Sequence, residues 1–267
     1  MSSPINYNRV FTSRGSAGIF LALTLLLAAC GSSIATPAPT DTTVPTETSI
    51  ATSPCANPYF PVVEGATWTY LATGTGEDST WTATVSEVSE TGFTLSTQFD
   101  ELATTQQWAC TPEGLAALQY GGGPEAVITA SSLLGVFETS DASGVSIPAQ
   151  IQVGDAWQQS FSMHGQMVIR EGVTADANGT ISQSFVATGL ETVAVPAGSF
   201  EAMKVDTNIV FDLQLSMGGI SLPMNFDAVS TNWWAPGIGW VKSDSTADLE
   251  GSDSIMWLIE LQSYSIP

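Results

Sequence analysis

Apolar and polar residues alternate most regularly on either side of Gly218-Gly219. Every second residue is apolar across 209–217, and the same holds across 220–228. A two-residue Gly-Gly turn fixes the pairing of such strands, and here it places Phe211 opposite Phe226. A slip of one residue would move one apolar face to the polar side. The pattern therefore predicts an antiparallel hairpin with one buried face.

The dipeptide Asn178-Gly179 predicts a second hairpin. Asn-Gly supplies the positive φ angles of a tight turn, and alternating segments flank it. Residues 176–182 also resemble the start of a calcium-binding loop, but they lack its later acidic ligands and its terminal Glu. We therefore expect a turn at 176–179 and no metal site.

Short alternating segments recur along the rest of the chain, with turn residues every 8–12 positions or so, as in a sandwich or barrel. The fold class predicted is all-β and antiparallel: a curved sheet, open barrel or sandwich of about 10–13 strands. Helical spacing of apolar residues occurs at 124–137, where a buried strand fits equally well.

A weak two-fold repeat is visible within this pattern. Gly65 and Trp68 form a Gly-x-x-Trp motif that opens an alternating segment, and Gly154 and Trp157 form another. We expect one antiparallel β domain made of two related halves, at about 55–147 and 148–267.

The N-terminus has the features of a lipoprotein signal peptide over residues 1–29. Two arginines precede the apolar run 17–29, which is shorter than the roughly 20 residues of a membrane-spanning helix. The run ends in Leu27-Ala28-Ala29-Cys30, which resembles a bacterial lipobox. That resemblance implies cleavage before Cys30 and a diacylglyceryl lipid on its sulfur. The alternative is an ordinary secretory signal with a chance cysteine.

Residues 30–54 read as a lipidated cysteine followed by a flexible tether. Pro, Ser and Thr dominate residues 31–54 and no apolar face recurs, so this stretch cannot pack. The lipid on Cys30 is expected to hold the protein at the cell membrane or outer membrane, on the extracytoplasmic face.

The strongly negative net charge of the chain excludes some classes of binding partner. The chain has 5 Lys and Arg against 26 Asp and Glu, a net charge of −21, and one His. Such an acidic protein cannot neutralise phosphates, so nucleic acid is excluded as a partner. A single His rules out His-His metal motifs, and no cofactor is expected.

Two cysteines remain in the domain once Cys30 is lipidated. Cys55 and Cys110 are expected to form a disulfide, because exported domains usually pair their cysteines. Two buried free thiols are the alternative. No Cys-x-x-Cys motif is present, so a redox-active site is not expected.

No catalytic residues are predicted. His164 is the only histidine, and the nucleophile motif Gly-x-Ser-x-Gly does not occur. The acidic pairs Glu77-Asp78 and Asp100-Glu101 would point to opposite faces of a strand, whereas glycoside hydrolysis needs two facing carboxylates.

Aromatic and methionine residues supply the candidate binding sites. Trp233 and Trp234 are adjacent, so one should point inward and the other outward, where it could stack on a sugar or anchor a partner. Methionines near the hairpin phenylalanines could line an adaptable apolar pocket, with ordinary core packing as the alternative. The candidate ligand or partner contacts are Trp233, Trp234, Phe211, Phe226, Met217 and Met224.

Three segments together resemble a known family. They are VEGATWTY at 63–70, VPAGSFEAMKVDT at 195–207 and WWAPGIGWVKSDS at 233–245. In this order they resemble bacterial lipoproteins related to the DUF3108 and TapB-like groups, over most of 58–246. The resemblance implies an antiparallel β fold, such as the open barrel of LolA/LppX-type lipoprotein carriers, and it brings no activity.

The function expected is that of a lipid-anchored, non-catalytic protein that binds an apolar ligand or an envelope partner. One alternative is a passive structural or surface module. Another is a glycan-binding module or a hydrolase acting on surface glycans. An apolar cavity would favour a carrier, a solid core with one exposed aromatic patch would favour an interaction module, and a cleft with two facing carboxylates would favour the hydrolase.

Overall fold

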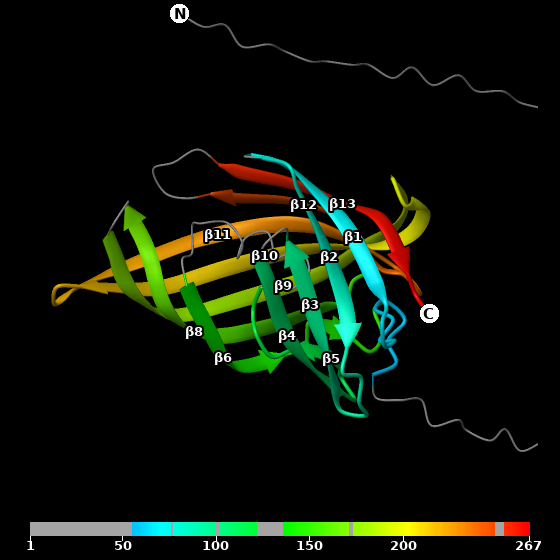
Figure 1. Ribbon diagram of the computed structural model, residues 1–267, viewed down its shortest axis with the longest axis horizontal. Helices are drawn as coiled ribbons and strands as arrows, with labels where there is room; N and C mark the ends of the chain where they lie inside the picture. The colour runs from blue at the N-terminus through cyan, green and yellow to red at the C-terminus, as the bar shows by residue number, and fades with distance from the viewer. Residues whose placement is uncertain (1–54, 76, 100–101, 122–135, 171–172, 249–253) are drawn as a thin grey trace, which may run out of the picture. The chain divides into compact units, whose positions relative to one another are not determined.

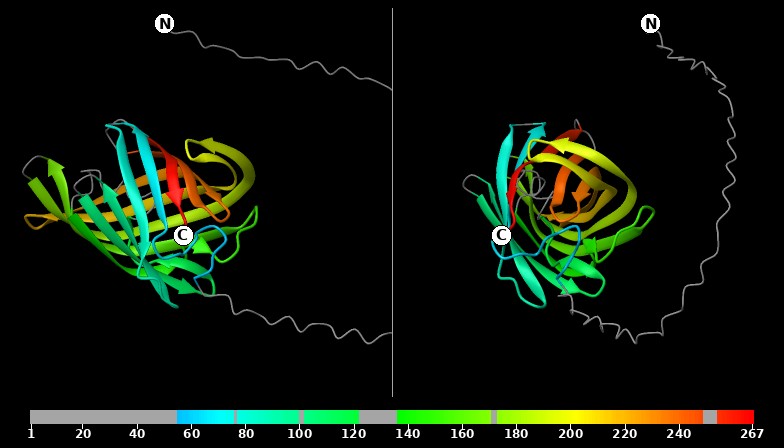
Figure 2. Two further views of the ribbon diagram at one scale, coloured as in Figure 1. Left: turned by 45° about the vertical axis from the view of Figure 1, so that its right-hand side comes forward. Right: turned by 90° about the vertical axis from the view of Figure 1, so that its right-hand side faces the viewer.

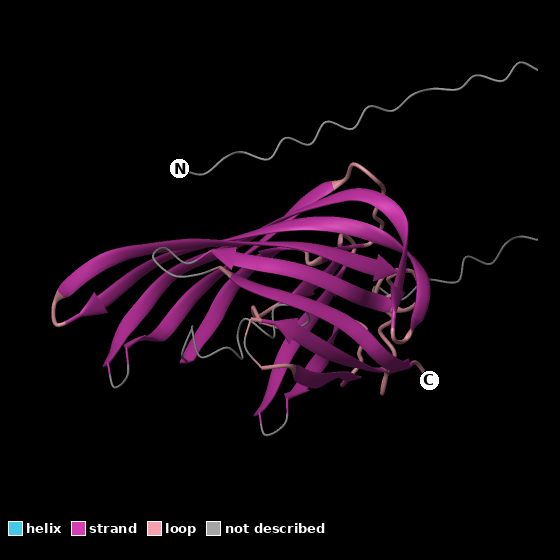
Figure 3. Cartoon of the chain, turned by 90° about the horizontal axis from the view of Figure 1, so that it is seen from above, coloured by secondary structure: helices cyan, strands magenta, loops and turns pink. Residues whose placement is uncertain are grey.

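The computed structural model describes residues 55–267 apart from 76, 100–101, 122–135, 171–172 and 249–253 (Figure 1). All regular structure in these residues is β-strand, which confirms the all-β prediction (Figure 3). None of the described residues forms a helix that could serve as a membrane span. Cys30, the tether and most of 124–137 lie outside the described residues.

The thirteen strands of the described residues are β1 (Thr67–Gly74), β2 (Ser79–Ser86), β3 (Gly92–Phe99), β4 (Leu102–Thr111), β5 (Gly114–Ala117), β6 (Val136–Gly144), β7 (Ile147–Pro148), β8 (Ala156–Arg170), β9 (Val173–Val195), β10 (Gly198–Met217), β11 (Ile220–Ala235), β12 (Gly239–Asp248) and β13 (Ile255–Ser265).

These strands form one antiparallel sheet with the order β6-β8-β9-β10-β11-β12-β13-β1-β2-β3-β4-β5-β7. The last strand, β13, pairs with the first, β1, and so joins the two halves of the domain. The sheet curls round on itself, so that β1–β4 face the long strands β8–β11 (Figure 2). The inward side chains of both halves therefore share one core.

Side-chain hydrogen bonds connect the two ends of the curled sheet. The Gln159 amide on β8 donates to the Ala117 carbonyl on β5 at 2.8 Å. Ser146 lies between them: its hydroxyl donates to Gln159 Oε1 at 2.5 Å and accepts from the Ala117 N–H at 3.0 Å. Strands β5 and β8 are not neighbours in the sheet, and the segment between β6 and β7 bridges them: the Val145 N–H donates to the Gln158 carbonyl at 3.3 Å and the Ser146 N–H to the Leu115 carbonyl at 2.9 Å. The side-chain contacts therefore add to a closure that the backbone also makes.

The predicted hairpin is confirmed as β10 and β11. Gly218 and Gly219 form its turn with φ of 59° and 84°, and Phe211 pairs with Phe226 as expected. Burial follows the predicted alternation near the core but not at the turn, where Met217 is 53% exposed. The hairpin projects beyond the rest of the sheet, at the far left of Figure 1.

The predicted turn at 176–179 is wrong. These residues lie inside β9, where Asn178 pairs with His164 on one side and Gln214 on the other. Gly179 is needed for a different reason: a Cβ there would lie 2.0 Å from the Asp212 carbonyl oxygen on β10. The glycine thus permits close strand approach, and the chain reverses earlier, since β8 ends at Arg170 and β9 begins at Val173.

The two-fold repeat appears as matching backbone hydrogen bonds. At the first motif, the Gly65 N–H donates to the Val85 carbonyl at 2.9 Å. At the second motif, the Gly154 N–H donates to the Ala187 carbonyl at 2.8 Å. In each motif a strand begins two residues after the glycine, at Thr67 of β1 and at Ala156 of β8. The tryptophan is the second residue of that strand. The repeat predicted from Gly-x-x-Trp is therefore present in the local structure.

The Cys55–Cys110 disulfide is also confirmed. It joins the start of the described chain to β4, with the two Cα atoms 4.9 Å apart. A closed loop of this length stabilises a fold by roughly 4 kcal/mol in the chain-entropy account.

Candidate functional site

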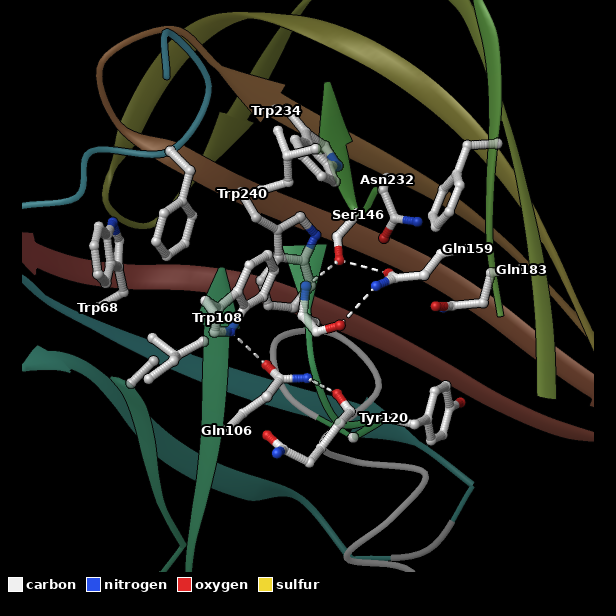
Figure 4. Close-up of a pocket in the computed structure, with 18 of the residues that line it drawn as sticks. Trp68, Gln106, Trp108, Tyr120, Ser146, Gln159, Gln183, Asn232, Trp234 and Trp240 are labelled. Atoms are coloured by element: carbon white, nitrogen blue, oxygen red, sulfur yellow. Dashed lines mark hydrogen bonds between the residues drawn. The ribbon is translucent and has the colours of Figure 1, made fainter. Parts of the chain in front are cut away.

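A cavity of about 80 Å³, partly open to solvent, lies inside the curled sheet; we call it the central cavity (Figure 4). It is bounded by both halves of the domain, because β1, β2 and β4 supply one side and β8, β9, β11 and β12 supply the other. Its lining residues are Phe60, Trp68, Tyr70, Trp81, Ala83, Leu95, Gln106, Trp108, Ala117, Gln119, Tyr120, Gly121, Ser146, Ile147, Gln159, Phe161, Gln183, Phe185, Asn232, Trp234 and Trp240.

Packed aromatic rings form the apolar part of this lining. Tyr70 and Trp81 pair across β1 and β2 with ring centroids 4.4 Å apart, and Tyr70 lies 4.5 Å from Trp240 on β12. Trp234 is the cross-strand partner of Trp240. The period-2 alternation of these strands points all four rings inward, so a continuous aromatic wall crosses the sheet.

Amide side chains interrupt the wall at positions where the alternation calls for apolar residues. Gln106, Gln159, Gln183 and Asn232 are each at least 94% buried. Gln106 Oε1 accepts a hydrogen bond from the Trp108 indole at 2.8 Å, and its amide donates to the Gln119 carbonyl. Burial of amides is costly unless they are hydrogen-bonded, so their convergence on one cavity sets it apart from an ordinary core.

Four buried polar atoms on the cavity have no hydrogen-bond partner among the described residues. They are the indole nitrogens of Trp81, Trp234 and Trp240 and the side-chain oxygen of Asn232. Figure 4 shows Asn232, Trp234 and Trp240 on one side of the cavity, with Gln106 and Tyr120 on the other. An unsatisfied buried polar group costs about 1–3 kcal/mol. A lining with four such groups is suited to a molecule that supplies their partners.

The amide of Asn232 is held so that its oxygen stays available. Its nitrogen donates to the Thr207 hydroxyl at 3.1 Å and to the Ser230 hydroxyl at 2.9 Å. Both donor hydrogens are thus engaged on the β10–β11 side, and the oxygen has no such contact. The neighbouring strands therefore fix the orientation of an acceptor on the cavity.

The cavity lining is electrically neutral. Among the described residues that line it there is no Asp, Glu, Lys, Arg, His or Cys. Burial raises the pKa of the Tyr70 hydroxyl well above its ordinary value. That hydroxyl donates to the Trp240 carbonyl at 2.9 Å. The described residues therefore give the cavity polarity through neutral donors and acceptors.

Trp233 and Trp234 lie on opposite faces, as predicted. Trp234 is 8% exposed and lines the central cavity. Trp233 lies on the outer face, where its ring centroid is 5.6 Å from the Lys242 Nζ and 6.0 Å from the Lys204 Nζ. Its indole N–H donates to Glu191. Trp233 is therefore one member of a cross-strand ladder of charged and aromatic side chains.

The four hairpin candidates do not line the central cavity. Phe211 and Phe226 stack at 4.2 Å and are buried, so they belong to the packed core beside it. Met224 is half-buried and Met217 exposed, on the face that the phenylalanines share. Partner binding by this apolar end of the hairpin stays a prediction.

The remaining candidates form no chemical site among the described residues. His164 lies on the exposed face of β8, with its Nε2 atom 3.3 Å from a Glu138 carboxylate oxygen. No group of three or more His, Cys, Asp or Glu side chains is arranged to hold a metal ion in that part of the chain. The acidic pair Asp100-Glu101 lies outside it.

Comparison with protein families identifies part of the domain. Residues 138–251 match the DUF3108-like family, which confirms the resemblance noted from the sequence motifs over this segment. The segment carries Gln159, Gln183 and Asn232 of the cavity lining. No curated protein matches the chain.

Three solved structures share features of the fold. An exported protein with a YmcC-like fold from Bacteroides fragilis aligns over 79% of this chain and all of its own, with 15% identity and a TM-score of 0.49. A lipoprotein from Parabacteroides distasonis aligns over 78% and 99%, with 14% identity and a TM-score of 0.46. The hypothetical lipoprotein YmcC from Escherichia coli aligns over 76% and 85%, with 10% identity and a TM-score of 0.35.

Proposed function

We propose that this protein is a lipid-anchored binding protein of the cell envelope, and that it holds a small molecule in the central cavity without converting it. The lipobox at Cys30 and the Pro/Ser/Thr-rich tether support the anchoring and the extracytoplasmic location. Lipid on one cysteine holds the domain at a membrane, while the tether leaves the cavity free to meet its ligand.

The observation that carries the binding function is the set of four unpartnered polar atoms on one aromatic cavity. Ordinary cores satisfy their buried polar groups, and each exception in a native fold asks for an explanation. A ligand explains all four together, since it would supply acceptors and a donor where the protein supplies none.

The composition of the lining supports binding over catalysis. General acid–base and nucleophilic mechanisms use ionisable side chains within hydrogen-bond reach of the substrate. Among the described lining residues, Tyr70 and Tyr120 are the ionisable groups, and burial keeps Tyr70 in its neutral form. The lining can orient a molecule and exclude water from it.

Native mass spectrometry of the full-length protein from its own membrane tests this function. The wild type should carry a bound small molecule that is released on unfolding. Ala83→Leu fills the cavity from β2 and should lower the occupancy at least tenfold, while Ala194→Leu on an exposed position of β9 should leave it unchanged. An empty wild type, or equal occupancy in both variants, would contradict the proposal.

A further inference from the structure

The four lining atoms without hydrogen-bond partners indicate which polar groups the ligand carries. Trp81, Trp234 and Trp240 each present an indole N–H, which is a donor only, and Asn232 presents an acceptor oxygen. From these atoms, and resting on the proposed binding function, we infer that the ligand is a neutral, planar molecule. It carries at least one oxygen acceptor and one hydroxyl or N–H donor.

The same lining disfavours a charged ligand. An ionised carboxylate moved into a site without Lys, Arg or His keeps an uncompensated charge, which is far costlier than burying a neutral group. An ammonium cation would gain from the aromatic faces. It would, however, leave all three indole N–H groups without acceptors, and none of the described lining residues is a carboxylate that could balance it.

The shape of the ligand follows from the aromatic wall and the volume. Flat rings such as Tyr70, Trp81 and Trp240 bind planar molecules by offset stacking. The cavity measures about 80 Å³, less than the roughly 150 Å³ of an internal cavity that accepts benzene. A whole aromatic ring is therefore too large for the cavity, so we expect the polar edge of the molecule to enter it and the rest to extend toward the open side.

The indole N–H signals of the full-length protein, labelled with ¹⁵N at tryptophan, test the ligand class by NMR. Phenol, toluene, benzoate and tetramethylammonium serve as probes that differ in polarity and charge. Phenol should shift one or two of the signals of Trp81, Trp234 and Trp240 downfield in a saturable way, because its oxygen has two lone pairs and can accept from at most two indoles. Trp157 lies outside the lining and already donates to the Ser146 carbonyl at 3.1 Å, so its signal should stay in place.

A conservative variant separates hydrogen bonding from packing. Trp240→Phe keeps an aromatic ring and removes one donor, so phenol should bind about tenfold more weakly while toluene binding is unchanged. Trp257→Phe, on a buried residue outside the lining, is the matched control and should alter neither. An unmoved Trp157 signal reports that each variant is folded.

The other possible results of these experiments contradict either the ligand class or the binding function, and the two cases can be told apart. If toluene bound as tightly as phenol, the site would be one for an apolar ligand. If benzoate or tetramethylammonium shifted the signals of the three indoles, it would be one for a charged ligand. Both would leave the binding function standing. Native mass spectrometry could also detect a bound molecule that Ala83→Leu removes, while phenol shifts no signal. That result would contradict the inferred ligand class and leave the binding function standing. No response to any probe, with an empty native protein, would remove the function itself.

Discussion

Gln159 on β8 donates a 2.8 Å hydrogen bond to the backbone carbonyl of Ala117 on β5, beside the point where the backbone of Val145 and Ser146 bonds to both strands. The same amide accepts from the Ser146 hydroxyl. One side chain thus links the two ends of the curled sheet and borders the central cavity. The stability of the curl and the shape of the site depend on the same contact.

Replacement of Gln159 by Leu should lower the free energy of unfolding by about 1–3 kcal/mol. Leucine has a similar volume but leaves the Ala117 carbonyl and the Ser146 hydroxyl without their partner, and unsatisfied buried groups carry a cost of this size. Urea denaturation measures the loss. Gln158→Leu, on the exposed neighbour, is the control, and equal effects of the two variants would show that the closure contributes nothing.

Truncation of the stacked pair Phe211 and Phe226 tests the packed core. Phe211→Ala or Phe226→Ala should each cost about 3–5 kcal/mol, because a cavity remains where the rings stood. Asp212→Ser and Asn225→Ser, on the outer face of the same register, should cost less than about 0.5 kcal/mol. Urea denaturation of the four variants compares them, and similar losses at inner and outer positions would contradict the register.

The hairpin at Gly218-Gly219 could be predicted because two independent signals agreed. The apolar alternation on both sides and the two-residue turn specify the same register, and the structure has it. At Asn178-Gly179 only the turn signal was present. A glycine that permits close approach of β9 and β10 looks the same in a sequence as one that permits a turn, since the approach depends on a strand more than 30 residues away.

The cavity was only partly predictable. Trp234 was identified from the alternation, but Gln159, Gln183 and Asn232 were missed. A signal existed for two of them: Gln159 lies between Trp157 and Phe161 in the alternation, and Gln183 lies between Ile181 and Phe185. Their convergence could not be read from the sequence, because it arises when the curl brings β5 and β8 together.

Substitution of two glycines on β9 tests the corrected assignment. Gly179→Ala should cost about 1–3 kcal/mol, as overpacking does, because its Cβ would meet the Asp212 carbonyl oxygen at 2.0 Å. Gly189→Ala should be tolerated within about 0.5 kcal/mol, since nothing lies within 4 Å of its Cβ. Thermal unfolding of both variants is the measurement. A tolerated Gly179→Ala would mean that β9 and β10 are not in close contact at this point.

Replacement of Cys30 by Ala tests the anchor. Without the sulfur no thioether to a lipid can form, so the variant should appear as a soluble protein or as an uncleaved precursor. Membrane fractionation and intact-mass measurement distinguish these products from the lipidated wild type. Ser32→Ala is the control in the tether. A Cys30→Ala protein that matures and fractionates with membranes like the wild type would disprove lipid anchoring.

The free energy of unfolding should depend on pH above about pH 10 through Tyr70. Below this value the hydroxyl is protonated in both states and contributes no pH dependence. Above it the unfolded chain loses the proton near the ordinary value of 10.0, while burial raises the pKa of folded Tyr70 well beyond it. The folded state then binds more protons, so stability falls as pH rises, by up to about 1.4 kcal/mol per pH unit.

Tyr70→Phe isolates this effect. The variant loses the 2.9 Å hydrogen bond to the Trp240 carbonyl and should be about 1 kcal/mol less stable than the wild type at neutral pH. It has no hydroxyl to titrate, so the difference should shrink and then reverse as the pH rises above 10. Burial also raises the pKa of Tyr59, but this contribution is common to both proteins and cancels. Urea denaturation between pH 7 and 11 gives the two profiles, and parallel profiles would show that Tyr70 titrates equally in the folded and unfolded chains.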